Sequence, residues 1–216
     1  MKIRVKICCI SSPEEARMAI SFGAAALGLV GQMPSGPGVI SDARIAEIAG
    51  QTPPGVATFL LSSETNGPAL VAHQQRTHTS TLQLVDRVPT DTYATIRAAL
   101  PALKIVQVVH VLDEHSVAEA LAAAGHVDAL LLDSGNPNLG IKELGGTGRT
   151  HDWSLSRRIV EQSPVPVYLA GGLHAGNVRE AIDKVQPFGL DLCSGVRTQG
   201  ALDPYRLEQF FNAVYS

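Results

Sequence analysis

A thiol, a carboxylate and several glycine-rich turns lie at or after the ends of predicted strands in this chain of 216 residues. The thiol is Cys8, at the end of Lys6-Ile7-Cys8, and the carboxylate is Asp133, directly after Leu130-Leu131-Leu132. Thiols and carboxylates in such positions can transfer protons to and from a substrate. Glycine-rich turns can present backbone N–H groups to phosphate oxygens. Together these residue types predict acid–base chemistry on a small phosphorylated molecule.

Cys8 shares one face of its expected strand with Arg4 and Lys6, because alternate residues of a strand point the same way. Lys6 beside Cys8 favours the thiolate, which a base or nucleophile requires. The alternative for Cys8 is a small buried hydrophobe, which is the commoner role of a cysteine. The opposite face of the strand is apolar and should contact the outer helices; it consists of Ile3, Val5, Ile7 and Cys9.

Asp133 allows two interpretations. Burial at the end of an apolar strand would raise its pKa and suit it to the role of a general acid. Its carboxylate can equally cap the loop that follows. If Cys8 and Asp133 face each other across one site, they form a base and an acid on opposite sides of a substrate.

Three glycine-containing turns are the candidate phosphate site. Barrel enzymes commonly bind phosphate at the loops after the seventh and eighth strands. Ordinary tight turns also use glycine, and this remains the alternative. The residues concerned are Gly146, Thr147 and Gly148 in Gly145-Gly146-Thr147-Gly148, then Gly171 and Gly172, then Ser194 and Gly195.

Strand-like and helix-like runs alternate along the whole chain, in about eight β-then-α units with no linker between them. This count predicts one α/β domain spanning 1–216, a closed (β/α)8 TIM barrel, with a doubly wound open sheet as the alternative. Ser12 and Ser41 are expected to cap helices. The long segments 31–40 and 134–153 follow strands and should border the active face. Strands are expected at 3–10, 25–30, 56–61, 81–85, 104–111, 127–133, 165–170 and 189–193.

Composition excludes several classes of function. The formal net charge is -3 and the 17 Lys and Arg form no runs, which argues against nucleic acid as a partner. No apolar stretch reaches the ~20 residues of a membrane span. Three cysteines do not make a disulfide framework, so we expect a reducing, cytoplasmic compartment. The seven histidines lack metal-ligand spacing, so no metal is expected.

Seven segments occur in an order that is similar to the signature of a known enzyme family. They are Lys6-Ile7-Cys8, Ala26-Leu27-Gly28-Leu29-Val30, Asp128-Ala129-Leu130-Leu131-Leu132-Asp133-Ser134, Gly145-Gly146-Thr147-Gly148-Arg149-Thr150-His151-Asp152-Trp153, Leu169-Ala170-Gly171-Gly172-Leu173, Asn177-Val178 and Cys193-Ser194-Gly195-Val196. In this respect the chain resembles the phosphoribosylanthranilate isomerases, from Lys6 to about Phe211.

The resemblance implies a cofactor-free (β/α)8 barrel of tryptophan biosynthesis that performs an Amadori rearrangement. It implies that Asp133 is the general acid that protonates the ribose ring oxygen. It implies that Cys8 is the general base that removes the C2 proton of the sugar. The three glycine-containing turns would hold the substrate phosphate.

Four positions depart from the family pattern. Gly38 stands where an arginine usually meets the anthranilate carboxylate, and Val85 replaces a histidine. Cys9 replaces a glycine, and Arg197 replaces a glutamate. Lys6, Arg149 and Arg197 are possible substrate contacts, and either arginine would supply the missing positive charge.

These departures keep three hypotheses open. The first is turnover of the anthranilate compound itself. The second is isomerisation of another phosphorylated sugar amine, and the third is a barrel that binds a phosphometabolite without catalysis. The partner in each case is a small phosphorylated molecule, and the chain is expected to be a monomer or a homodimer.

Overall fold

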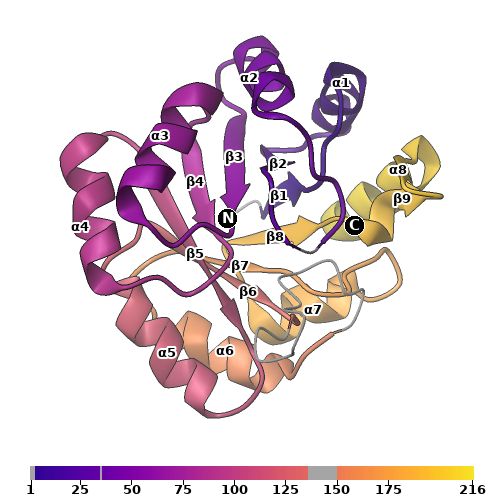
Figure 1. Cartoon of the computed structure of the whole chain (residues 1–216). Coiled ribbons are helices and arrows are strands. Elements are labelled where there is room, and N and C mark those ends of the chain that lie inside the picture. The colour runs from indigo at the N-terminus through magenta and orange to yellow at the C-terminus, as the bar shows by residue number, and fades with distance from the viewer. Residues whose placement is uncertain (1–2, 35, 136–149) are drawn as a thin grey trace.

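Eight parallel strands close into a barrel, and helices surround it (Figure 1). The structure is a computed structural model that describes residues 3–34, 36–135 and 150–216. The barrel strands are β1 (Arg4–Ile7), β2 (Ala26–Val30), β3 (Ala57–Ser62), β4 (Thr81–Leu84), β5 (Lys104–His110), β6 (Ala129–Asp133), β7 (Val167–Leu169) and β8 (Gly189–Leu192). The helices are α1 (Pro13–Ser21), α2 (Asp42–Gln51), α3 (Gly67–Thr77), α4 (Thr90–Ala99), α5 (His115–Ala124), α6 (Trp153–Gln162), α7 (Val178–Val185) and α8 (Pro204–Tyr215).

The first and last strands of the barrel pair with each other. β1 lies parallel to both β2 and β8, and its register places Lys6 opposite Asp191 and Ile7 opposite Leu192. This pairing closes the sheet. It confirms the predicted TIM barrel and excludes the doubly wound open sheet.

Helices α1 and α2 each have a serine N-cap, as predicted. The Oγ atom of Ser12 accepts a hydrogen bond from the Glu15 backbone N–H at 3.3 Å, and Ser41 caps α2 through Arg44 at the same distance. Each bond satisfies a backbone donor that the first turn of a helix leaves without a partner.

Alternation along the strands creates two apolar layers. Val5 and Ile7 belong to the large layer between the strands and the helices, whereas Cys8 belongs to a smaller cluster inside the barrel. The prediction that Cys8 faces the barrel interior is therefore confirmed.

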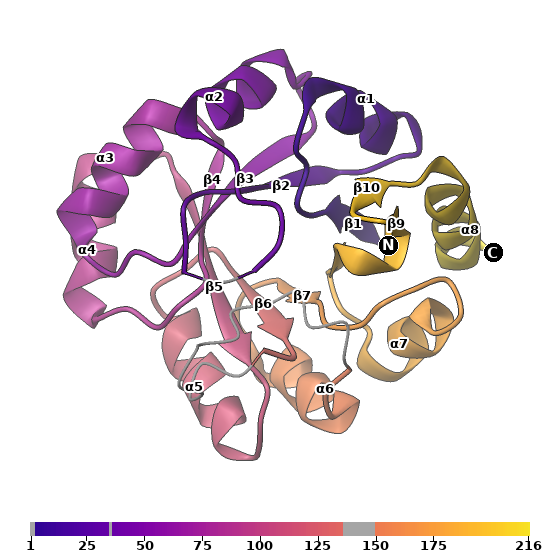
Figure 2. The same cartoon turned by 45° about the vertical axis from the view of Figure 1, so that its right-hand side comes forward.

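The segment after β8 contains elements that the sequence did not reveal. A short 3-10 helix, η1 (Ser194–Val196), leads into a two-stranded hairpin of β9 (Arg197–Thr198) and β10 (Ala201–Leu202). Figure 2 shows this hairpin beside β1 and α8. The expected strand 3–10 is also shorter than predicted, because β1 ends at Ile7. Among the described residues, no helix is long and apolar enough to cross a membrane.

Candidate active site

A cavity lies at the carboxyl end of the barrel strands, where ligands collect in this fold. Its volume is about 720 Å³ when measured out to the open mouth. Cys8, Asp133, Gly171, Gly172 and Ser194 all line it. The structure thus brings together the predicted thiol, the predicted carboxylate and two of the three predicted glycine turns.

An ion pair lies beneath the cavity. Lys6 is fully buried, and its Nζ atom donates to Asp191 Oδ1 at 2.8 Å. Burial alone would lower the pKa of Lys6, but the Asp191 carboxylate more than offsets this and raises it. Asp191 lines the cavity and Lys6 does not, so the expected substrate contact of Lys6 is not part of this geometry. Asp191 was missed in the sequence, because its partner lies 185 positions away.

Asp133 has the structural features that each of the two interpretations requires, a backbone hydrogen bond and burial. Its Oδ1 atom accepts a hydrogen bond from the Ser134 backbone N–H at 2.7 Å, while its side chain lines the cavity with only 8% of the residue exposed. Desolvation by burial is the main reason that the pKa of Asp133 is raised, and the negative charge of Asp191 adds to the rise. The hydrogen bond from the Ser134 backbone N–H, and then interactions with His110 and Lys6, act in the opposite direction but do not reverse the rise.

Gly28 makes room for the thiol and the ammonium together. A Cβ atom at this position of β2 would lie 2.7 Å from Cys8 Sγ and 2.9 Å from Lys6 Nζ. Only glycine therefore allows both side chains to occupy the barrel interior at this level. The sequence contained Gly28 within a family segment, but only the strand register reveals this role.

Cys9 lies on the opposite side from the one predicted. The expectation that Cys9 points toward the outer helices is wrong, because the strand ends before it and its backbone adopts φ +61°. Cys9 lines the cavity beside Cys8. It also explains Gly38, where a Cβ atom would lie 2.6 Å from Cys9 Cβ on a backbone with φ +80°. With Cys9 present, an arginine at this position would overlap it, so the two departures from the family pattern are in direct contact.

One wall of the cavity is apolar. Val85, at the position of the family histidine, is buried in this wall. Within the described residues, the charged side chains that line the cavity are carboxylates, Asp133 and Asp191. The apolar side chains of the wall are Val30, Met33, Leu61, Val85, Val108 and Leu131.

Glycines allow the turns after β7 and β8 to lie close together. Gly171 and Gly172 adopt φ values of +82° and +62°, which favour glycine. A Cβ atom on Gly195 would overlap the carbonyl oxygen of Leu173, so this position also requires glycine. The remaining predicted phosphate contacts, in Gly145-Gly146-Thr147-Gly148, and also Arg149, lie outside the described residues.

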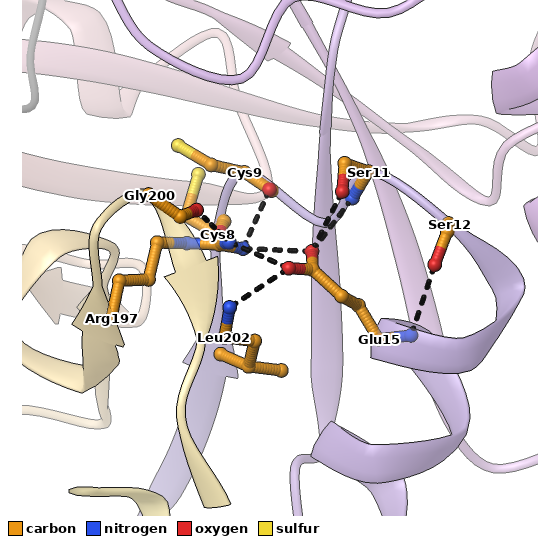
Figure 3. Close-up of polar contacts among 8 residues, drawn as sticks. All are labelled: Cys8, Cys9, Ser11, Ser12, Glu15, Arg197, Gly200 and Leu202. Carbon is orange, nitrogen blue, oxygen red and sulfur yellow. Dashed lines mark hydrogen bonds and ion pairs between the residues drawn. The ribbon is translucent and has the colours of Figure 1, made fainter.

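Arg197 braces the loop after β1, as Figure 3 shows. Its Nη1 atom donates to Glu15 Oε1 at 2.8 Å, and its Nη2 atom donates to the carbonyl oxygens of Cys9 at 2.6 Å and Cys8 at 3.3 Å. The side chains of Arg197 and Glu15 are only 8% and 14% exposed. Arg197 does not line the cavity, so the structure gives it this bracing contact rather than the expected contact with substrate.

No group of three or more His, Cys, Asp or Glu side chains that could hold a metal ion occurs within residues 3–34, 36–135 and 150–216.

Comparison with known proteins assigns the family. Residues 5–213 match the family described as N-(5'phosphoribosyl)anthranilate (PRA) isomerase. The chain belongs to this isomerase family. Its enzyme type is therefore that of the PRA isomerases of tryptophan biosynthesis, as the sequence resemblance implied.

Curated PRA isomerases align with almost all of the chain. The isomerase of Methanocella arvoryzae is 32% identical over 208 residues, which cover 96% of this chain and 95% of the relative. That of Thermosynechococcus vestitus is 34% identical over 198 residues, covering 92% and 83%.

Solved isomerase structures share the fold. The Thermotoga maritima phosphoribosyl anthranilate isomerase superposes with a TM-score of 0.83 at 29% identity, covering 98% of both chains. Another, solved in complex with reduced 1-(o-carboxyphenylamino)-1-deoxyribulose 5-phosphate, has a TM-score of 0.80 at 27% identity, again covering 98% of both chains.

Removing only the cation of the buried ion pair should destabilise this isomerase strongly. Lys6→Met leaves Asp191 buried without its partner, and we expect a loss of about 3–5 kcal/mol in the free energy of unfolding. Lys6→Met/Asp191→Leu removes both charges and should recover most of the loss. Urea unfolding of the two variants measures this. Equal losses in both would contradict the account.

Arg197→Ala should lower the free energy of unfolding by about 1–3 kcal/mol, because Glu15 and the backbone carbonyls of Cys8, Cys9 and Gly200 lose charge-assisted hydrogen bonds. Arg197→Lys keeps the charge but not the planar fork, so it should recover only part of the loss. This can be tested by chemical denaturation of both variants. The control is Arg179→Ala, which removes an exposed arginine on α7. Parent-like stability of Arg197→Ala would exclude a bracing role.

Asp133→Asn should stabilise the fold at neutral pH. Because burial raises the pKa of Asp133, the native state holds its proton more tightly than the unfolded chain does. Stability is therefore lost as pH rises from the ordinary value of 3.8 through the raised native pKa, and the variant lacks this loss. We expect a gain of about 0.5–2 kcal/mol at pH 7 that shrinks toward pH 4. A gain that is independent of pH would disagree with the raised pKa.

Proposed function

We propose that the enzyme converts N-(5-phosphoribosyl)anthranilate to its 1-deoxyribulose 5-phosphate product, with Asp133 as general acid and Cys8 as general base. The observation that carries the proposal is the shared cavity. It is lined by a buried carboxyl whose pKa is raised and by a thiol on a neighbouring part of the barrel mouth.

Asp133 acts first in this scheme. Because burial raises its pKa, a larger fraction of the carboxyl keeps its proton than in an ordinary aspartate. The protonated group donates to the ribose ring oxygen, and the ring opens to a Schiff base. Asp191 is instead bound to the Lys6 ammonium at 2.8 Å, so the two carboxyl groups of the cavity have different environments.

Cys8 acts second. Its thiolate removes the C2 proton of the opened sugar, and the resulting enolamine tautomerises to the aminoketose. The Lys6 ammonium interacts favourably with the negative form of the thiol. Gly28 allows the two groups to lie this close.

The substrate spans the mouth from one wall to the other. The phosphate contacts the backbone of Gly171, Gly172, Ser194 and Gly195, together with the Gly146-Thr147-Gly148 turn. The aryl group packs against the apolar wall. The complex of a relative with a phosphorylated product analogue supports a phosphate subsite in this family.

The unit that acts is one barrel domain of residues 1–216, without a cofactor. It is a monomer or a homodimer, and a dimeric relative is known from Thermotoga maritima.

A second candidate function differs at the aryl end. Gly38 and Cys9 leave no room for an arginine, and Val85 continues the apolar wall. These contacts favour a phosphoribosylamine whose aromatic group carries no carboxylate. In the first function, Arg149 is the residue that meets the anthranilate carboxylate.

The proposal can be tested by following the loss of fluorescence of freshly prepared N-(5-phosphoribosyl)anthranilate in the presence of the enzyme. Cys8→Ala and Asp133→Asn should each lower kcat by about 10²–10⁴-fold, the contribution of one proton-transfer group. The control is Asp183→Asn, an exposed carboxylate on α7, which should leave kcat unchanged. Near-parental rates in either site variant would remove that residue from the mechanism.

The same assay with N-(5-phosphoribosyl)aniline separates the two candidate functions. Turnover of the anthranilate compound that depends on Arg149 supports the first. Turnover of the aniline compound alone supports the second.

A further inference from the structure

The three cysteines of the chain converge on one place. Cys8, Cys9 and Cys193 all line the cavity, and all are free thiols. The proposed mechanism uses only Cys8. Two further thiols at the mouth of the site therefore have no role in the isomerisation.

Strand register explains why these thiols meet. The register pairs Ile7 with Leu192, and the Cys8 backbone N–H donates to the Leu192 carbonyl oxygen at 2.9 Å, so Cys8 and Cys193 follow the paired ends of two neighbouring strands. Cys193 packs against the inner cluster that contains Cys8 and Cys9. A disulfide joins cysteines whose Cα atoms lie about 4.4–6.8 Å apart, a spacing typical of residues at the ends of neighbouring strands.

The two thiols differ in chemical character. The hydrogen bond from Cys9, and then the positive charge of Arg197, lower the pKa of Cys193. The same hydrogen bond, a second one to Cys8 and burial raise the pKa of Cys9. Cys193 is partly exposed to the cavity, whereas Cys9 is buried. Cys193 is thus the more acidic of two thiols that line the same cavity.

The backbone holds Cys9 in this contact. Its φ of +61° is uncommon for a residue with a side chain and turns the thiol toward the cavity. Gly38 packs against its Cβ atom, and Arg197 holds its carbonyl oxygen (Figure 3). The brace that fixes the loop therefore also brings the guanidinium close to Cys193.

We propose that Cys193 is a site of oxidation by small hydroperoxides and that Cys9 is its resolving partner. The Cys193 thiolate attacks one peroxide oxygen and the O–O bond breaks. Hydroxide leaves from hydrogen peroxide, or an alkoxide from an organic hydroperoxide, and a sulfenic acid forms. The Cys9 sulfur then attacks the Cys193 sulfur, an S–S bond forms, the S–O bond breaks, and water leaves with the thiol proton. Two thiols are oxidised by two electrons, and one peroxide is reduced.

The disulfide joins Cys9, which follows the proposed base Cys8, to Cys193, which precedes Ser194 of the proposed phosphate turn. It therefore constrains the chain on both sides of the base and the phosphate turn, and it stops isomerisation while it persists. This effect on turnover rests on the proposed function, whereas formation of the disulfide does not. Thiols regenerate the reduced enzyme by exchange.

Treatment of the full-length protein with hydrogen peroxide tests the inference. Mass spectrometry of the digested Cys8→Ala protein should find a disulfide between Cys9 and Cys193, without ambiguity from the neighbouring thiol. In the parent, turnover should fall by about tenfold or more, since the base alone contributes at least this much, and dithiothreitol should restore it.

Cys9→Gly is the matched variant, and the turnover of its peroxide-treated sample is compared with that of its own untreated sample. It should form no disulfide, and dithiothreitol should recover less of its lost turnover because oxidation passes beyond the sulfenic acid. Absence of the Cys9–Cys193 disulfide, or a Cys8–Cys193 disulfide in the parent, would overturn the proposal. So would a disulfide that leaves turnover intact. A protein with no turnover before treatment refutes the proposed function, and the disulfide map still decides the modification site.

Discussion

The Lys6–Asp191 ion pair lies where the barrel closes. β1 and β8 are the first and last barrel strands, and their register places these two side chains opposite each other inside the sheet. A buried ion pair is tolerated only when each charge has its partner, because an isolated buried charge costs several kcal/mol. The pair therefore favours one register of closure. Cys8, which follows Lys6 by two residues on the same face, owes its place in the cavity to that register.

The same pair separates the roles of two carboxylates. Asp191 is bound by Lys6, whereas Asp133 is buried and accepts a hydrogen bond from a backbone N–H. Desolvation therefore raises the pKa of Asp133, while Asp191 has a cation as its partner. Environments that differ in this way assign acid and base chemistry in many enzymes. The buried lysine thus acts through charge and geometry, without reaching the cavity itself.

Local pattern was sufficient to predict the architecture. Alternation of strand and helix runs predicted the barrel, the spacing of Arg4, Lys6 and Cys8 predicted the inner face of β1, and Ser12 and Ser41 marked their helices. Each of these features is visible in residues that lie close together in the sequence.

The features that were missed depend on contacts between distant segments. The role of Asp191 depends on its ion pair with Lys6, and the role of Arg197 depends on its ion pair with Glu15, 182 positions away. The direction of Cys9 was predicted from strand alternation, which fails where β1 ends early. The contact between Cys9 and Gly38 shows why two departures from the family pattern occur together. None of these pairings is visible until the barrel is closed.

The most direct test of this account is the titration of the Asp133 carboxyl, followed by ¹³C NMR with Asp133→Asn used to assign its signal. The account predicts a midpoint above the ordinary value of 3.8, and a further rise in Lys6→Met, where Asp191 loses its partner and one cation is removed. A midpoint at or below the ordinary value would contradict the assignment of Asp133 as the proton donor.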